Sequence, residues 1–103
     1  MLDWYETPCE FVLVLDKPEN VTDLYDYMEK VGALPEEKAK EIFLQIVKAV
    51  LHCHENGIVH RDIKDENILI DHKTLKVKLI DFGSATMLSV SIILWCVYFT
   101  CPI

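Results

Sequence analysis

The feature that most constrains this chain is a pair of polar strings separated by two short apolar runs. The first string, His-Arg-Asp-Ile-Lys-Asp-Glu-Asn, occupies 60–67, and the second, Asp-Phe-Gly, occupies 81–83. The apolar runs at 68–70 and 77–80 flank a polar turn that begins at Asp71, a pattern that predicts two short strands. Two strings of defined residues at a fixed separation arise by chance far less often than a single short motif does.

The two strings resemble the catalytic loop and the metal-binding triplet of the protein kinases. The resemblance implies that Asp62 accepts the proton of a substrate hydroxyl and that Lys64 places its charge on the transferred phosphate. It also implies that Asn67 and Asp81 hold magnesium, because Mg²⁺ prefers hard oxygen ligands. In that family, a lysine at the place of Lys64 accompanies serine/threonine specificity. The implied reaction therefore transfers the γ-phosphate of ATP to Ser or Thr hydroxyls of proteins.

The histidines and Arg61 are expected to be structural rather than catalytic. By the same resemblance, His60 props the catalytic loop through backbone contacts, and Arg61 meets a phosphorylated activation loop. His52 and His54 lie two residues apart on a predicted helix, so they do not face each other and are not expected to bind a metal. His72 is expected to be a solvated turn residue.

The remaining pattern predicts an α+β fold. Residues 2–5 and 11–15 form two predicted strands joined by a turn that contains proline. A short helix is predicted to be capped by Asn20 or Thr22 and to stop near Gly32.

A longer helix is predicted from Pro35, which is tolerated at the first helical position, to Gly57. Its apolar residues recur at spacings of three, four or seven, as a one-sided buried stripe requires. The stripe comprises Ala39, Ile42, Phe43, Ile46, Val47, Val50 and Leu51. We expect this helix to form the spine of a small lobe.

Charge and cysteine content limit the class of partner. The chain of 103 residues has a formal net charge of -7, and phosphate neutralisation needs clustered Lys and Arg, so no nucleic-acid partner is expected. A basic peptide suits this charge better.

The four cysteines form no zinc-type spacing and no signal peptide opens the chain, which predicts reduced thiols. We expect a monomer in the cytoplasm, and also in the nucleus.

Two longer segments narrow the resemblance. Residues 11–20 run Phe-Val-Leu-Val-Leu-Asp-Lys-Pro-Glu-Asn, and the catalytic loop continues with Ile-Leu-Ile to residue 70. Both look like the Pim family of serine/threonine kinases. This resemblance implies a partial kinase domain over 1–85, which holds the end of the small lobe, a hinge at 16–18, and the front of the helical large lobe up to the Asp-Phe-Gly triplet.

The hinge implied by this resemblance has an unusual proline. Leu15 takes the gatekeeper position, and Pro18 stands where most kinases donate a backbone N–H to adenine, although a proline has none. Adenine would then keep one hinge bond, to the carbonyl of Asp16. It would depend more on apolar contacts with Leu69 and Ile80.

The same comparison implies an acidic groove for substrates rich in arginine and lysine. Asp23, Asp26 and Glu66 stand where the acidic contacts of the family stand, and bidentate pairing of arginine with carboxylates gives such sites their geometry. The alternative interpretation is that Asp23 and Asp26 lie on a solvated helix face without a partner.

Other parts of a kinase active site have no counterpart in the sequence. An active kinase needs a glycine-rich loop and a lysine ahead of the hinge, whereas the three glycines are Gly32, Gly57 and Gly83 and the first lysine is Lys17. The fragment is therefore expected to be catalytically incomplete. A non-catalytic peptide-binding module, or decoy, derived from a kinase is the alternative function.

Residues 86–103 form a divergent apolar tail that carries no charge. A membrane-spanning helix needs about 20 mostly apolar residues. The tail is shorter and interrupted by Ser, Thr and Pro, so a membrane anchor is not favoured.

Overall fold

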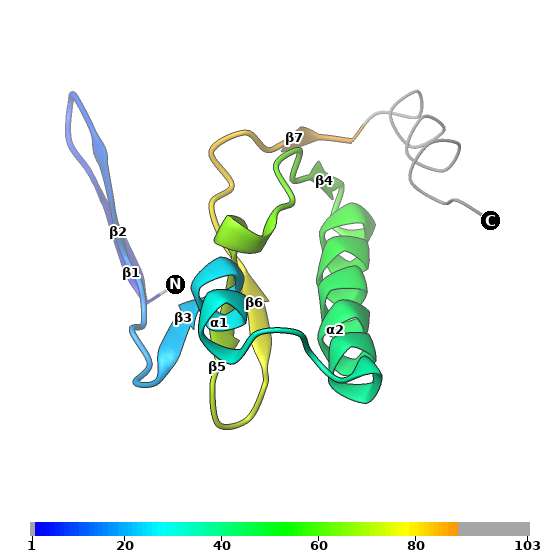
Figure 1. The fold of residues 1–103 in the computed structure, drawn as a ribbon. Coiled ribbons are helices and arrows are strands. Elements are labelled where there is room, and N and C mark those ends of the chain that lie inside the picture. The colour runs from blue at the N-terminus through cyan, green and yellow to red at the C-terminus, as the bar shows by residue number, and fades with distance from the viewer. Residues whose placement is uncertain (1, 89–103) are drawn as a thin grey trace.

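The computed structural model describes residues 2–88. Figure 1 shows a mixed fold of small antiparallel sheets and two helices, which confirms the α+β prediction. The elements in chain order are β1 (Asp3–Glu6), β2 (Phe11–Val14), β3 (Val21–Asp23), α1 (Leu24–Val31), α2 (Glu36–Glu55), β4 (Ile58–Val59), the 3₁₀ turn η1 (Asp65–Asn67), β5 (Ile68–Asp71), β6 (Val77–Leu79) and β7 (Thr86–Met87).

The centre of the molecule is a three-stranded antiparallel sheet in the order β3-β5-β6. Successive side chains of a strand point to opposite faces, so Ile68 and Ile70 of β5 share one face and are 4% and 1% exposed. They pack with Leu24 and Tyr27 of α1 and with Ile42 of α2. The other face carries Leu69 and borders a cavity.

Helix α1 begins one residue after the prediction allowed. Asp23 is the N-cap, because its side chain accepts a hydrogen bond from the N–H of Asp26 at 2.8 Å. The predicted caps are wrong: Thr22 lies inside β3 and pairs with Ile70, while Asn20 adopts a left-handed backbone with φ 60°. The predicted end at Gly32 is confirmed.

Helix α2 ends as predicted and begins at Glu36, one residue after the prediction, but it does not have the predicted burial. Pro35 is its N-cap and Gly57 follows its C-cap, Asn56. Of the predicted stripe only Ile42 is fully buried, and Phe43 is 66% exposed. The predicted buried stripe is therefore confirmed only in part: Ile46, Val47 and Val50 are half-buried, and among the described residues α2 packs mainly against β6 and β4.

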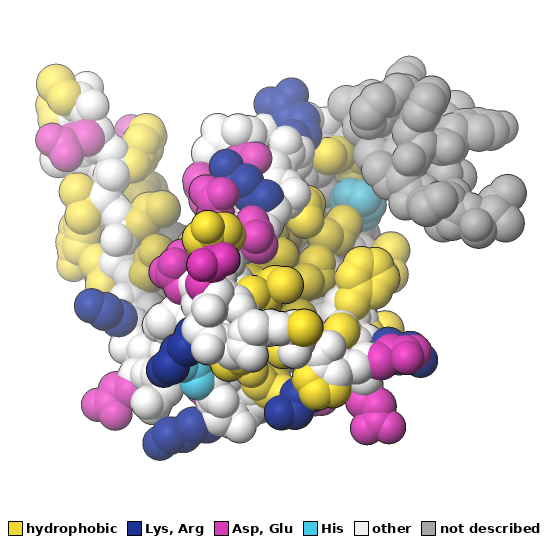
Figure 2. Space-filling view, viewed as in Figure 1, with side chains coloured by type: hydrophobic (Ala, Val, Ile, Leu, Met, Phe, Trp, Pro, Cys, Tyr) yellow, Lys and Arg dark blue, Asp and Glu magenta, His cyan; other side chains and the backbone are white. Residues whose placement is uncertain are grey.

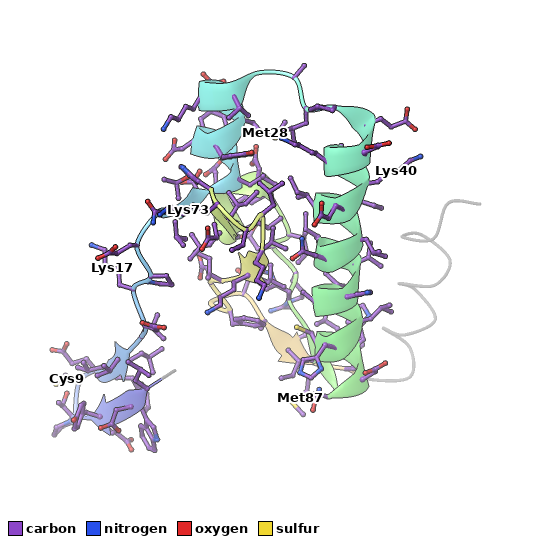
Figure 3. The ribbon with its side chains drawn as sticks, turned by 90° about the horizontal axis from the view of Figure 1, so that it is seen from below. Cys9, Lys17, Met28, Lys40, Lys73 and Met87 are labelled. Atoms are coloured by element: carbon purple, nitrogen blue, oxygen red, sulfur yellow. The ribbon has the colours of Figure 1, made fainter. Side chains whose placement is uncertain are left out.

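The hairpin of β1 and β2 confirms the predicted strand pair. Its strands align Trp4 with Leu13 and Tyr5 with Val12. Figures 1 and 3 show the hairpin, which carries Cys9, standing apart from the rest and joined to it by the linker that carries Lys17. The hairpin side chains are accordingly exposed.

The turn between β5 and β6 departs from the prediction at one residue. Asp71 holds the turn, since its Oδ1 accepts the N–H groups of Lys73 and Thr74 at 2.8 and 3.1 Å. His72 is half-buried and lies 2.6 Å from the hydroxyl of Thr22. The expectation of a solvated His72 is wrong, because β3 and α1 lie beside the turn.

The first residues of the apolar tail belong to this fold. Thr86 and Met87 form β7, which pairs with Val59 and Ile58 of β4. No helix within residues 2–88 is both long and apolar enough to cross a membrane. The rest of the tail prediction falls on 89–103, outside the described residues.

Candidate active site

His60 anchors the loop that follows β4. It is 2% exposed, and its two ring nitrogens hold the backbone on either side: Nε2 is 2.8 Å from the carbonyl oxygen of Ile80, and Nδ1 is 3.1 Å from the N–H of Asp62. One neutral tautomer satisfies both contacts, with Nε2–H donating and Nδ1 accepting. The ring also meets Phe82 edge-on at 4.8 Å. The predicted backbone-propping role of His60 is confirmed.

Asp62 lies at the centre of a polar cluster. The amide nitrogen of Asn67 donates to both the backbone carbonyl and Oδ2 of Asp62, at 2.9 and 3.0 Å. The Lys64 ammonium lies 3.7 Å from the same Oδ2. The short turn η1 makes this possible, because it folds the chain back between Asp62 and Asn67, which lie five positions apart.

The Asp-Phe-Gly triplet lies next to this cluster. The N–H of Ile80 donates to the carbonyl of Asn67 at 2.9 Å, which places Asp81 one residue from the loop. The Oδ1 of Asp81 accepts the N–H of Gly83 at 3.1 Å. A Cβ on Gly83 would lie 3.0 Å from that oxygen, so glycine suits this close approach.

Two residues of the site have strained backbones. Arg61 has φ 69° and Asp81 has φ 60°, a region that non-glycine residues rarely adopt. Such outliers persist where the surroundings fix them, and they concentrate at functional sites. At Arg61 the side chain contributes, since its Nε donates to the carbonyl of Ser84.

A cavity of about 680 Å³ covers the open face of the central sheet. The five residues predicted to surround adenine all line it: Leu15, Asp16, Pro18, Leu69 and Ile80. The segment at 15–18 and the sheet, distant in sequence, thus form one recess of ligand-binding size.

The cavity also has lining residues that sequence reasoning missed. Val21 and Lys78 lie opposite Asp71 and Leu69 in the strand register, so strand pairing would have revealed them. Gln45 bridges α2 to the sheet by donating to the carbonyl of Leu75 at 2.9 Å and accepting from the N–H of Val77 at 3.1 Å. A polar residue inside an otherwise apolar stripe was the signal for Gln45.

The predicted acidic residues gather at one end of α1. Asp23 and Asp26 lie at the start of α1, which contacts the η1 turn that carries Glu66. Figure 2 shows acidic side chains over this region. The charge of Asp23 raises the pKa of Asp26, with smaller contributions from desolvation, from the Asp23 hydrogen bond and from Glu29. An incoming cation would relieve this repulsion.

The donor set suits a magnesium ion with few protein ligands. Among residues 2–88 no three His, Cys, Asp or Glu side chains converge on one point. The predicted pair, the Asp81 carboxylate and the Asn67 amide oxygen, instead supplies two hard oxygens. Mg²⁺ commonly takes one or two carboxylate ligands and completes its octahedron with water and substrate phosphates.

Comparison with protein families decides the identity of the fold. The family described as the protein kinase domain matches residues 1–99. The chain belongs to the protein kinase family. The match extends past residue 85, the predicted end of the partial kinase domain. That domain boundary stays a prediction.

Individual kinases are also similar to the chain. The serine/threonine-protein kinase pim-2 of Danio rerio is 51% identical over 89 residues, which cover 85% of this chain and 29% of that kinase. The serine/threonine-protein kinase prk-2 of Caenorhabditis elegans is 44% identical over 88 residues, 85% of this chain and 20% of that kinase. The chain thus spans under a third of either relative. The resemblance to Pim-type kinases is confirmed.

Proposed function

We propose that this kinase chain carries the front of an active site that transfers the γ-phosphate of ATP to Ser or Thr of basic protein substrates. Asp62 accepts the hydroxyl proton, and Lys64 neutralises charge on the transferred phosphate. One observation carries the proposal: Asn67 donates to Asp62 at 3.0 Å while its backbone accepts from Ile80, the residue directly before Asp81.

Lys64 also supports the assigned role of Asp62. The Lys64 ammonium lies 3.7 Å from Oδ2 of Asp62, so it stands beside the group proposed to accept the proton. The pair is partly exposed, so water weakens this interaction, and a substrate hydroxyl can still approach. A dianionic phosphate can draw Lys64 toward it without leaving Asp62 unpartnered, because Asn67 still donates to the same oxygen.

Nucleotide and metal have separate places in this proposal. The cavity under the hinge takes adenine, with Leu69 and Ile80 as its floor, while Pro18 offers no N–H. Asn67 and Asp81 hold magnesium. When bound, the ion neutralises charge on the phosphate oxygens.

The acidic residues at the start of α1 support the choice of basic substrates. Carboxylates of Asp23 and Asp26 repel each other, and an arginine side chain bound between them and Glu66 replaces that repulsion with charge-assisted hydrogen bonds. The net charge of -7 favours the approach of a basic peptide.

A chimera tests whether the cluster is competent for catalysis. Residues 2–88 replace the matching segment of the Danio rerio pim-2 kinase, and transfer from ATP to an arginine-rich peptide is measured. We expect an active chimera, and Asp62→Asn to lower kcat by about 10² to 10⁴ because the general base is lost. Asp65→Asn, a neighbouring carboxylate outside the cluster, is the control. An active Asp62→Asn chimera would contradict the role of Asp62.

The isolated chain of 103 residues is proposed to be inactive alone. Its three glycines and first lysine leave no phosphate-covering loop or lysine ahead of the hinge, and losing one such electrostatic contact typically costs about 10² to 10³ in rate. Asp62-dependent turnover by the purified chain would refute this. Peptide binding without binding of magnesium-ATP would favour the non-catalytic module instead.

A further inference from the structure

His72 makes contacts that the proposed function does not use. It lies where β5 turns toward β6 and reaches two other elements. Its Nε2 is 2.6 Å from Oγ1 of Thr22 on β3, and its ring centroid lies 5.2 Å from that of Tyr27 on α1. Its backbone N–H donates to the carbonyl of Asn20 at 3.0 Å. The residue is therefore fixed at three points.

The hydroxyl of Thr22 links His72 to Asp23. Its Oγ1 lies 2.6 Å from Nε2 of His72 and 3.3 Å from the backbone carbonyl oxygen of Asp23. A hydroxyl has one hydrogen and two acceptor lone pairs, so it can bond both groups. The contacts run from His72 through Thr22 to Asp23.

Asp23 is the residue at which β3 ends and α1 begins. It also caps α1 by accepting the N–H of Asp26 at 2.8 Å, so its carboxylate and that of Asp26 are held close together despite their repulsion. The two side chains that His72 touches belong to Thr22, one residue before Asp23, and Tyr27, a buried residue on the first turns of α1. His72 thus contacts residues on both sides of the acidic pair, Thr22 before it and Tyr27 after it.

We infer that His72 is a positioning residue that fixes the geometry with which Asp23 and Asp26 receive a basic side chain of the substrate. The inference rests on the proposed preference for basic substrates. A guanidinium is rigid and planar, so its recognition depends on how accurately the two carboxylates are placed. If the junction between β3 and α1 loosens, the two carboxylates are placed less accurately, even though both remain.

Peptide binding to the 103-residue chain tests the inference. The dissociation constants of an arginine-rich peptide and of a neutral peptide of equal length are measured by fluorescence anisotropy. We expect His72→Ala to weaken binding of the arginine-rich peptide by about three- to tenfold, as loss of one hydrogen bond implies. Binding of the neutral peptide should not change. His52→Ala, an exposed histidine on α2, is the matched control.

Two further variants separate positioning from simple stability. His72→Gln carries an amide nitrogen at the same distance along the side chain and should restore the arginine preference. Thr22→Val removes only the relaying hydroxyl and should reproduce the loss, without adding to that of His72→Ala in the double variant. Hydrogen exchange should accelerate at the amide of Asp26 and stay unchanged at Gly32, the cap at the other end of α1.

The outcomes distinguish the positioning role of His72 from the proposed preference for basic substrates. If the parent chain prefers the arginine-rich peptide and Thr22→Val and His72→Ala keep the full preference, the role of His72 is overturned while the substrate proposal stands. If the parent chain shows no preference, the substrate proposal fails and the role of His72 fails with it. Should His72→Ala lower the folded fraction, Thr22→Val and His72→Gln decide the question.

Discussion

At the scale of single residues, Asp71 shows how one carboxylate holds a turn. Its Oδ1 accepts two backbone N–H groups, from Lys73 and Thr74. These bonds, that of Lys73 first, lower the pKa of Asp71 below its ordinary value because they favour the charged form. A depressed folded-state pKa contributes stability that is present above the unfolded pKa and is lost as pH falls through the folded value.

Replacing this carboxylate should change the acid sensitivity of the fold. We expect Asp71→Ala to lower Tm at neutral pH and to flatten the fall of Tm below about pH 4, where an unfolded aspartate takes up its proton. Thermal unfolding followed by circular dichroism from neutral to acidic pH measures both effects. Glu41→Gln on α2 is the exposed control. Parallel pH curves for Asp71→Ala and the parent chain would show that the turn does not depend on this charge.

At the scale of elements, the residues at which the helices stop were predictable, and the residue that caps the start of α1 was not. Gly32 and Gly57 adopt φ 73° and 74°, which glycine reaches at little cost, so the stop signals were local. Asn20 and Thr22 were the predicted caps of α1, but Asp23 is its N-cap. Thr22 belongs instead to β3, which pairs with β5 some fifty residues away.

The residues of the candidate site divide in the same way, into those close in sequence and those brought together by the packing of elements. Asp62, Lys64 and Asn67 lie within six residues of one motif, so the resemblance of that motif to the kinase catalytic loop was enough to propose them as site residues. His72 and Gln45 act across sequence separations of 50 and 30 residues. Such contacts depend on how elements pack, and a single sequence carries no local signal for them beyond an unexpected polar residue.

The helix-ending glycines allow a direct test of conformational cost. A Cβ on either Gly32 or Gly57 would meet no atom within 4 Å, so a change to alanine adds backbone strain and no steric clash. We expect Gly32→Ala and Gly57→Ala each to destabilise the fold by about 1 kcal/mol, measured by urea unfolding. Ala33→Gly, next to the cap, is the control. A neutral Gly57→Ala would mean that the helix can end in another conformation.

At the scale of the whole molecule, the described part has a small core and much exposed apolar surface. Its fully buried apolar residues are Leu24, Tyr27, Ile42, Val59, Ile68 and Ile70. Large apolar side chains remain exposed on the hairpin and on α2, Phe11 at 69% and Phe43 at 66% among them. Apolar surface on this scale favours association. Stability should therefore depend on a few positions, and solubility on many others.

Substitutions at two neighbouring residues of α2 should separate the effects on stability from those on solubility. Ile42 is 3% exposed and Phe43 is 66% exposed, although both belong to the same apolar pattern. We expect Ile42→Ala to cost about 2 to 5 kcal/mol, because it leaves a cavity in the core, and Phe43→Ala to change stability by at most about 0.5 kcal/mol. Phe43→Ala should instead raise solubility. Urea unfolding and light scattering measure the two effects, and an equal loss of stability at both positions would show that Phe43 is covered in solution.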